Sequence, residues 1–233
     1  MLLGFYRLLP DEPLKFLVLV VLWTLGLVVA VTIHEFSHAL VANGLGDSTA
    51  KLQGRLTLNP LKHLDPSGTL MLLVAGFGWG KPVPVNLHRL AHGATGTSLV
   101  AAAGPLSNLI LAFLLAIPIK LGLLDYTGLG LYRITPVTNG GILDGLSDLV
   151  SLIIFFNLLL AVFNLIPLAP LDGSRVLGGF VPGHREASYN RFQRYGPVIL
   201  VGIVMLDYAL GYGILWTVIG PFVRGLTFVA TGV

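Results

Sequence analysis

The sequence predicts an α-helical integral membrane protein with about five transmembrane helices and a small membrane-associated β or re-entrant segment. Hydrophobic residues make up 55% of the 233 residues and charged residues only 11%, whereas soluble domains usually carry about 25% charged residues. Because so few polar side chains cannot cover a globule of this size, lipid must be part of its solvent. The same composition excludes a disordered chain, and the absence of cysteine excludes disulfides and thiolate zinc sites.

The first predicted span is unusually long. Residues 14–33 are an almost unbroken run of Leu and Val, and apolar residues resume at 39–42 before Asn43 and Gly44 end the helix. At about 1.5 Å per residue, a helix over residues 14–42 would measure roughly 43 Å, which exceeds the roughly 30 Å hydrocarbon core. We do not interpret this run as a cleaved signal peptide, because no small-residue cleavage site follows a short apolar core.

Three further apolar regions predict four more crossings, which makes five in all. The regions are residues 98–119, 146–168 and 195–229. The last region is divided by Gly211 and Gly213 into two helices of about 16 to 18 residues, near the short limit for crossing a bilayer.

The connection between the first two spans departs from the helical pattern. Residues 51–58 partly alternate in hydropathy and lead into a turn signal, which predicts a strand. Residues 68–80 are apolar but too short to span, so we expect them to be re-entrant or interfacial. Prolines keep residues 81–85 extended, because a residue before proline avoids the helical region. We therefore assign about residues 48–90 to an interfacial segment of one membrane-embedded domain, residues 1–233.

Basic residues predict the orientation in the membrane. Most of them lie in the connections at residues 43–97 and 173–194, and few lie at residues 120–145. The positive-inside rule therefore places the connections at residues 43–97 and 173–194 in the cytoplasm. The net charge of +3 is too small to indicate nucleic-acid binding, and we expect the arginines of residues 173–194 to contact lipid headgroups.

The first span contains an H-E-x-x-H motif at residues 34–38. Residues four apart on a helix differ by about 40° in azimuth and about 6 Å in rise, so His34 and His38 can bind one ion. Glu35 lies on the neighbouring flank, where it can polarise a water molecule without binding the metal. A packed histidine pair is the alternative, but ionisable groups at membrane depth each cost about 2.5 kcal/mol or more, which favours a functional role.

Two histidines leave a catalytic zinc ion one protein ligand short, since such sites usually have three. Asp172 follows the proline-broken end of the third span, and the charge bias puts it at the depth of His34 and His38. An unwound helix at membrane depth is tolerated only where it lines protein or a cavity. For Asp172 taken alone, a helix-end cap or a surface acid is the alternative interpretation, but matched with the two histidines Asp172 is favoured as the third ligand.

Five stretches, in this order, together resemble the site-2 protease family of intramembrane zinc metalloproteases: residues 32–40, 59–68, 80–85, 103–108 and 164–173. The resemblance implies one zinc ion per chain held by His34, His38 and Asp172, a catalytic Glu35, and hydrolysis of transmembrane protein substrates near the cytoplasmic face. It also implies that Asn164 faces the site. In that position the Asn164 amide has two interpretations of equal weight. It donates a hydrogen bond to a developing oxyanion, or it donates one to another helix.

The same resemblance indicates a minimal prokaryotic member. Many relatives carry a PDZ-type or a nucleotide-sensing (CBS) domain, and no connection in this chain is long enough to hold one. We therefore expect a multi-pass protein of a prokaryotic cell membrane, with its active site toward the cytoplasm. The oligomeric state stays open, and Asn108 is expected to be structural.

Two other classes of function stay open at this stage. One is a cation or proton transporter, because intramembrane His, Glu and Asp also serve ion pathways; the lack of an inverted repeat argues against it. The other is a non-catalytic zinc-binding scaffold, against which the intact Glu35 argues. Residues 81–85 likewise have two interpretations, an edge strand that receives the unwound substrate or a simple extended connector.

Overall fold

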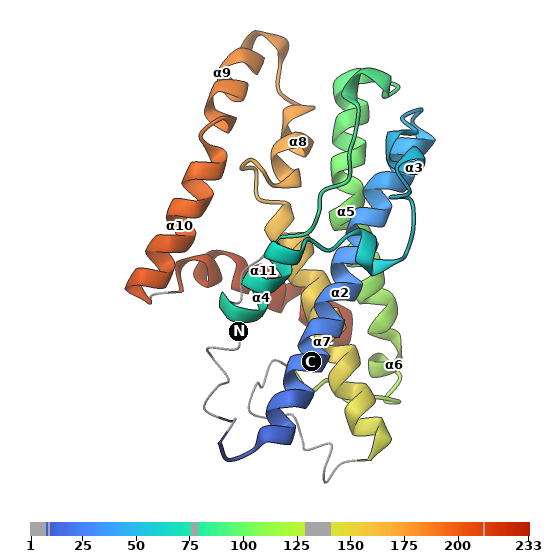
Figure 1. Ribbon diagram of the computed structural model, residues 1–233, viewed down its shortest axis with the longest axis vertical. Coiled ribbons are helices and arrows are strands. Elements are labelled where there is room, and N and C mark those ends of the chain that lie inside the picture. The colour runs from blue at the N-terminus through green and yellow to red at the C-terminus, as the bar shows by residue number, and fades with distance from the viewer. Residues whose placement is uncertain (1–7, 9, 76–78, 129–140, 212) are drawn as a thin grey trace.

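The computed structural model describes residues 8, 10–75, 79–128, 141–211 and 213–233, and this part of the chain is mostly helical and has no strand beyond an isolated bridge (Figure 1). Four described helices are long and apolar enough to cross a membrane: α2 (Pro13–Gly44), α5 (Gly93–Leu115) with its continuation α6 (Ile117–Lys120), α7 (Ile142–Asn164) and α11 (Ile214–Thr231). The predicted α-helical membrane protein is confirmed. The remaining predicted crossing corresponds to α10 (Gly196–Leu210), an apolar helix of only 15 residues.

Helices α2, α5 and α7 run side by side and form the centre of the molecule (Figure 1). Small residues let them approach closely, as in other membrane bundles. A Cβ atom on Gly26 of α2 would lie 3.0 Å from the ring of Phe156 on α7. Ala30, Ile154 and Leu158 are fully buried between these helices. The face that α2 does not bury is apolar and exposed, as expected for contact with lipid.

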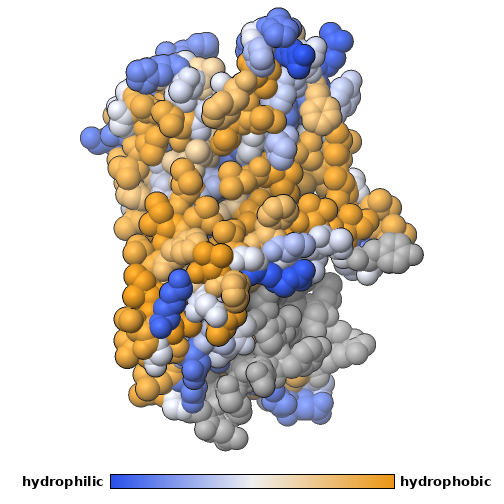
Figure 2. All heavy atoms as spheres, turned by 180° about the vertical axis from the view of Figure 1, so that it is seen from behind, coloured by the Kyte–Doolittle hydropathy of each residue, from blue (hydrophilic) through white to orange (hydrophobic). Residues whose placement is uncertain are grey.

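The two basic connections lie at the same end of the bundle. The short helix α3 (Thr49–Leu52) from the first connection and α9 (Gly183–Gln193) from the second both lie toward the top of Figure 1. Seen from behind, hydrophobic side chains cover most of the surface, and a group of hydrophilic ones gathers at this upper end (Figure 2). The arrangement agrees with the prediction that both connections share one side of the membrane.

The predicted strand over residues 51–58 is wrong. Among the described residues of this connection the backbone forms the helical turn of α3, the 3₁₀ turn η2 (Pro60–Lys62) and helix α4 (Pro66–Ala75), and the pairing is limited to an isolated bridge between Leu64 and Gly80. Hydrogen bonds from Thr49 to the buried carboxylate of Asp47 start the helical turn, and they override the weak alternation. Gly76 and Gly78 lie outside the described residues.

Residues 81–86 form an irregular connector that buried side chains hold in place. The guanidinium of Arg55 donates to the carbonyls of Lys81 and Pro82. The Asn86 N–H donates to Asp47 at 2.6 Å. Burial raises the pKa of Asp47, but the hydrogen bonds from Thr49 and Asn86 outweigh it and hold that pKa below its ordinary value. The connector is therefore fixed at both ends.

Candidate metal centre

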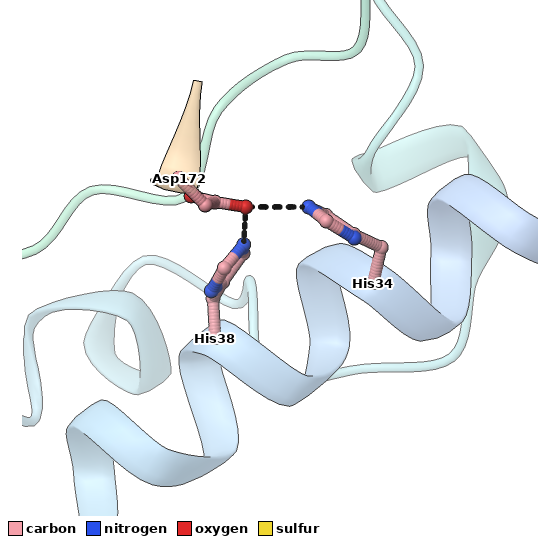
Figure 3. Close-up of side chains that lie close together, drawn as sticks. All are labelled: His34, His38 and Asp172. Atoms are coloured by element: carbon pink, nitrogen blue, oxygen red, sulfur yellow. Dashed lines mark ion pairs between the residues drawn. The ribbon is translucent and has the colours of Figure 1, made fainter. Parts of the chain in front are cut away.

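The structure brings His34, His38 and Asp172 together at one end of the bundle (Figure 3). The Nε2 atoms of His34 and His38 lie 3.0 and 3.2 Å from Oδ2 of Asp172. Both histidines come from α2, one helical turn apart, and both are buried. Asp172 is the first residue of α8 (Asp172–Gly178). Three ligand atoms within 4.8 Å of one another can hold a single metal ion.

The chain needs a tight turn to carry Asp172 back to the histidines. Helix α7 ends at Asn164, and α8 begins only eight positions later. Prolines 167 and 170 prevent the helix from continuing. At Gly173, an added Cβ atom would lie 2.3 Å from the carbonyl oxygen of Leu165, so the turn requires glycine there. The Asp-Gly pair therefore has two roles, a carboxylate for the site and the space that lets the chain fold over the end of α7.

Hydrogen bonds to the far side of each imidazole assign its tautomer. Nδ1 of His38 lies 2.7 Å from the carbonyl oxygen of Val100, which can only accept, so Nδ1 carries a proton. Nδ1 of His34 lies 2.7 Å from Oδ1 of Asn108. The Asn108 amide nitrogen donates to the carbonyl of Ala30 at 3.0 Å and to Oδ1 of Asn157 at 2.7 Å. This network leaves Oδ1 to accept from His34, so both histidines are protonated on Nδ1.

Because Nδ1 of each ring is bonded to an acceptor, Nε2 is the ring atom that faces Asp172, and in the neutral imidazole it carries a lone pair. Oδ2 of Asp172 is buried, and both Nε2 atoms lie within 3.2 Å of it. Three electron-rich atoms in one buried space repel one another unless a positive charge lies between them. Two imidazoles and a carboxylate are the ligand types that zinc takes in catalytic sites, and their outer hydrogen bonds match the usual support of zinc-binding histidines. The site therefore fits a zinc ion.

Gly104 of α5 gives the cluster the space it needs. A Cβ atom on Gly104 would lie 2.5 Å from Nε2 of His38 and 2.7 Å from Cε1 of His34. Only glycine allows α5 to pack this closely against the two imidazoles. Pro105, which follows it, is accommodated inside an unbroken α5.

Glu35 lies beside the cluster and outside it. Its Oε2 atom accepts a hydrogen bond of 3.1 Å from the backbone N–H of Val83 in the connector. Glu35 lines a cavity of about 310 Å³ together with His34, His38 and Asp172. The cavity has space for water and a peptide bond next to the carboxylate.

Asn164 also lines this cavity. Its amide nitrogen donates to the carbonyl of Leu160 at 3.0 Å, one turn back in the same helix. The bond within α7 replaces the expected bond to another helix. Because an amide nitrogen has two N–H groups, one remains to donate into the cavity.

Buried polar residues support the histidines, in a role that the sequence did not predict. Asn108 was expected to be structural, yet its side chain sets the tautomer of His34, and Asn157 in turn orients Asn108. Both amides are fully buried. A detectable signal was present, because an amide in the middle of an apolar span is costly without a partner.

An H-E-x-x-H helix that meets a distant carboxylate defines a metal-dependent protease, and here it stands within a bundle of membrane-type helices. Comparison with known proteins gives the same class. Residues 129–206 match the family model described as Peptidase family M50. "Putative zinc metalloprotease YwhC" of Bacillus subtilis (strain 168) is 43% identical over 190 residues, which cover 82% of each chain.

Two mycobacterial proteins named "Putative zinc metalloprotease Rip2" are also similar. The one from Mycolicibacterium smegmatis is 29% identical over 83% of this chain and 70% of its own length. The one from Mycobacterium tuberculosis (strain H37Rv) is 33% identical over 71% of this chain and 60% of its own length. No solved structure gives a significant match. The chain belongs to peptidase family M50, the site-2 proteases, and is a zinc metalloprotease of that type.

Proposed function

We propose that this protein hydrolyses peptide bonds of transmembrane substrates near the cytoplasmic face of the membrane. In this proposal His34, His38 and Asp172 hold one zinc ion per chain, Glu35 is the general base, and residues 1–233 act as one membrane-embedded domain. The observation that carries it is the cluster itself, in which Nε2 of His34, Nε2 of His38 and a carboxylate oxygen of Asp172 face one another beside Glu35.

Each residue of the proposed active site has its own role in hydrolysis. A zinc ion held by the cluster would supply the Lewis acidity that lowers the pKa of a water to about 7. Glu35 accepts the proton of the attacking water and passes it to the leaving amine. Val83 N–H orients the Glu35 carboxylate, and the second N–H of Asn164 donates to the oxyanion that develops on the carbonyl.

The substrate must present an unwound peptide bond. A helical backbone keeps its carbonyls in hydrogen bonds, so we expect helix-breaking residues in the substrate near the cleavage site. The cytoplasmic side follows from the two basic connections at the histidine end of α2. A prokaryotic cell membrane is supported by the bacterial sources of the relatives.

The sharpest experiment compares the native protein with the Glu35→Gln variant. Quantitative proteomics of membrane fractions should show that full-length transmembrane substrates accumulate in the variant, while zinc analysis gives one ion per chain in both. Glu186→Gln, an exposed acid on α9, is the matched control and should behave like the native protein. Identical proteomes for Glu35→Gln and native protein, with zinc still bound, would indicate a scaffold. Ion flux in liposomes that Glu35→Gln abolishes would indicate a transporter.

A further inference from the structure

A second cavity of about 310 Å³ lies next to the candidate active site. Three elements supply most of its apolar wall: Leu27, Val28 and Val31 of α2, Phe163 of α7 and Leu200 of α10. Helix α4 contributes Gly68 and Thr69. Leu200 is one of the two buried residues of α10.

The two cavities meet at the catalytic residues. His34, Glu35, Asn164 and Pro170 line both of them. The polar side chains that line the second cavity are His34, Glu35 and Asn164 at this shared end and Thr24, Thr69 and Trp79 elsewhere. Away from that end, the hydroxyl of Thr24 donates to the carbonyl of Val20 at 2.7 Å within α2, so it presents its methyl group. The cavity thus has the candidate catalytic side chains at one end and mostly apolar side chains over the rest of its wall.

We propose that this second cavity is a specificity pocket for one bulky apolar side chain adjacent to the scissile bond. The inference rests on the proposed protease function and names what that site selects. A peptide backbone at the shared end would reach Glu35 and Asn164, and the side chain next to the scissile bond would then project between Val28 and Leu200. A peptide fits this combination of a polar end and an apolar body better than a lipid acyl chain, which has no group for the polar end.

The pocket selects by size and shape more than by hydrophobicity. A substrate side chain that leaves lipid gains little hydrophobic free energy, because acyl chains are as apolar as Leu. Packing against the pocket wall therefore decides the fit, and charged side chains are rejected by the low-polarity wall. In enzyme pockets of this kind one methylene changes the specificity constant by about 10–200-fold.

The test uses the full chain in liposomes with a library of single-span peptides whose central residues are randomised around a Gly-Pro pair. Mass spectrometry of the products then gives the residue preference at each position. With the native protein, we expect one position beside the cleaved bond to prefer Leu, Met or Phe and to exclude Asp and Lys. Leu200→Trp or Val28→Trp should shift that single position toward Ala and Gly by about tenfold or more. Leu200→Ala should shift it toward Phe.

Matched controls lie on the same helices and face away from the cavity. Leu25→Trp on α2 and Val198→Trp on α10 replace side chains that are 45% and 73% exposed, and they should leave the preference unchanged. All variants should keep the native zinc content. If neither Leu200 variant alters the residue preference, or if cleavage of all peptides falls equally, the cavity does not bind the substrate side chain. A lipid acyl chain would then be its occupant.

A binding measurement separates this inference from the protease function itself. The native chain has no cysteine, so Leu200→Cys in the Glu35→Gln background can be crosslinked to a library peptide that carries one cysteine at the selected position. We expect a disulfide with Leu200→Cys and little with Val198→Cys. Equal yields at both sites would reject the pocket. Binding at Leu200 without cleavage by the native protein would reject the protease function and keep the pocket.

Discussion

The backbone N–H of Val83 donates a hydrogen bond of 3.1 Å to Oε2 of Glu35. The connector that contains Val83 is thus in direct contact with the proposed general base. Its position is set by Arg55, which binds the carbonyls of Lys81 and Pro82 immediately before it. A buried arginine far from the metal cluster in sequence therefore determines how the Glu35 carboxylate is held.

The first prediction concerns Arg55. Removing its charged hydrogen bonds costs about 1.5–3 kcal/mol, so Arg55→Gln should lower kcat by about tenfold or more and leave the zinc content unchanged. Arg55→Lys should recover part of the rate, since an ammonium group can bind one carbonyl but lacks the planar fork. Peptide cleavage assays and zinc analysis of both variants provide the check. Lys51→Gln, an exposed cation on α3, is the control; an equal loss there would refute a specific role for Arg55.

A second prediction concerns the amide that orients His34. Asn108→Leu removes the acceptor for Nδ1 and leaves the tautomer free, which should weaken zinc binding or activity by about 10–100-fold. Asn108→Asp supplies an acceptor at the same place and should keep more affinity than Asn108→Leu. Zinc titration against a competing chelator measures both. Ser107→Ala removes only a hydroxyl bonded within α5 and should have native affinity; Asn108→Leu with native affinity and native activity would contradict the assignment.

Close packing at Gly104 gives the third prediction. A methyl group there overlaps the two imidazoles at 2.5 and 2.7 Å, so Gly104→Ala should displace them and lower the zinc content sharply. Helix propensity alone would predict a gain in stability of about 0.5–1 kcal/mol for this change. Zinc content and the thermal midpoint Tm should therefore be measured together. Gly145→Ala on α7, where an added Cβ meets nothing within 4 Å, is the matched control. Full zinc content in Gly104→Ala would show that the site adapts.

These residues also show which features of the site and of the fold can be predicted from the sequence. The pairing of His34 with His38 follows from helical periodicity alone, and the approach of Asp172 follows from its membrane depth. The hydrogen-bond partners of the histidines cannot be predicted in this way. Asn108 and Asn157 meet through the lateral packing of α2, α5 and α7, which hydropathy does not encode. The predicted strand failed for a related reason. The buried carboxylate of Asp47, which accepts hydrogen bonds from Thr49 and from the distant Asn86, determines that connection, and short-range alternation carries no information about either bond.

The fourth prediction separates the metal ligands from the base. Asp172→Ala removes the carboxylate that faces both Nε2 atoms and should lower zinc content sharply. Glu35→Gln should retain zinc and lose activity, because Glu35 lies outside the cluster. Elemental analysis of the purified variants, alongside peptide cleavage, distinguishes the two effects. Asp65→Asn, in the connection between α2 and α5, is the control for general loss of an acid. Native zinc content in Asp172→Ala would remove Asp172 from the ligand set.

The last prediction asks whether the connector receives the substrate. Among the described residues it forms no strand ladder, and Val83 and Val85 both line the cavity beside Glu35. An extended peptide could therefore lie along its unpaired backbone groups, which is the usual logic of strand addition. Single cysteines at Val83 or Val85 in the Glu35→Gln background should crosslink to a substrate near its cleavage site. Leu121 lies at the far end of α5 and α6, so Leu121→Cys should crosslink poorly. Efficient crosslinking at Leu121 with none at Val83 or Val85 would mean that the substrate enters from the opposite end and that the connector serves only to hold Glu35.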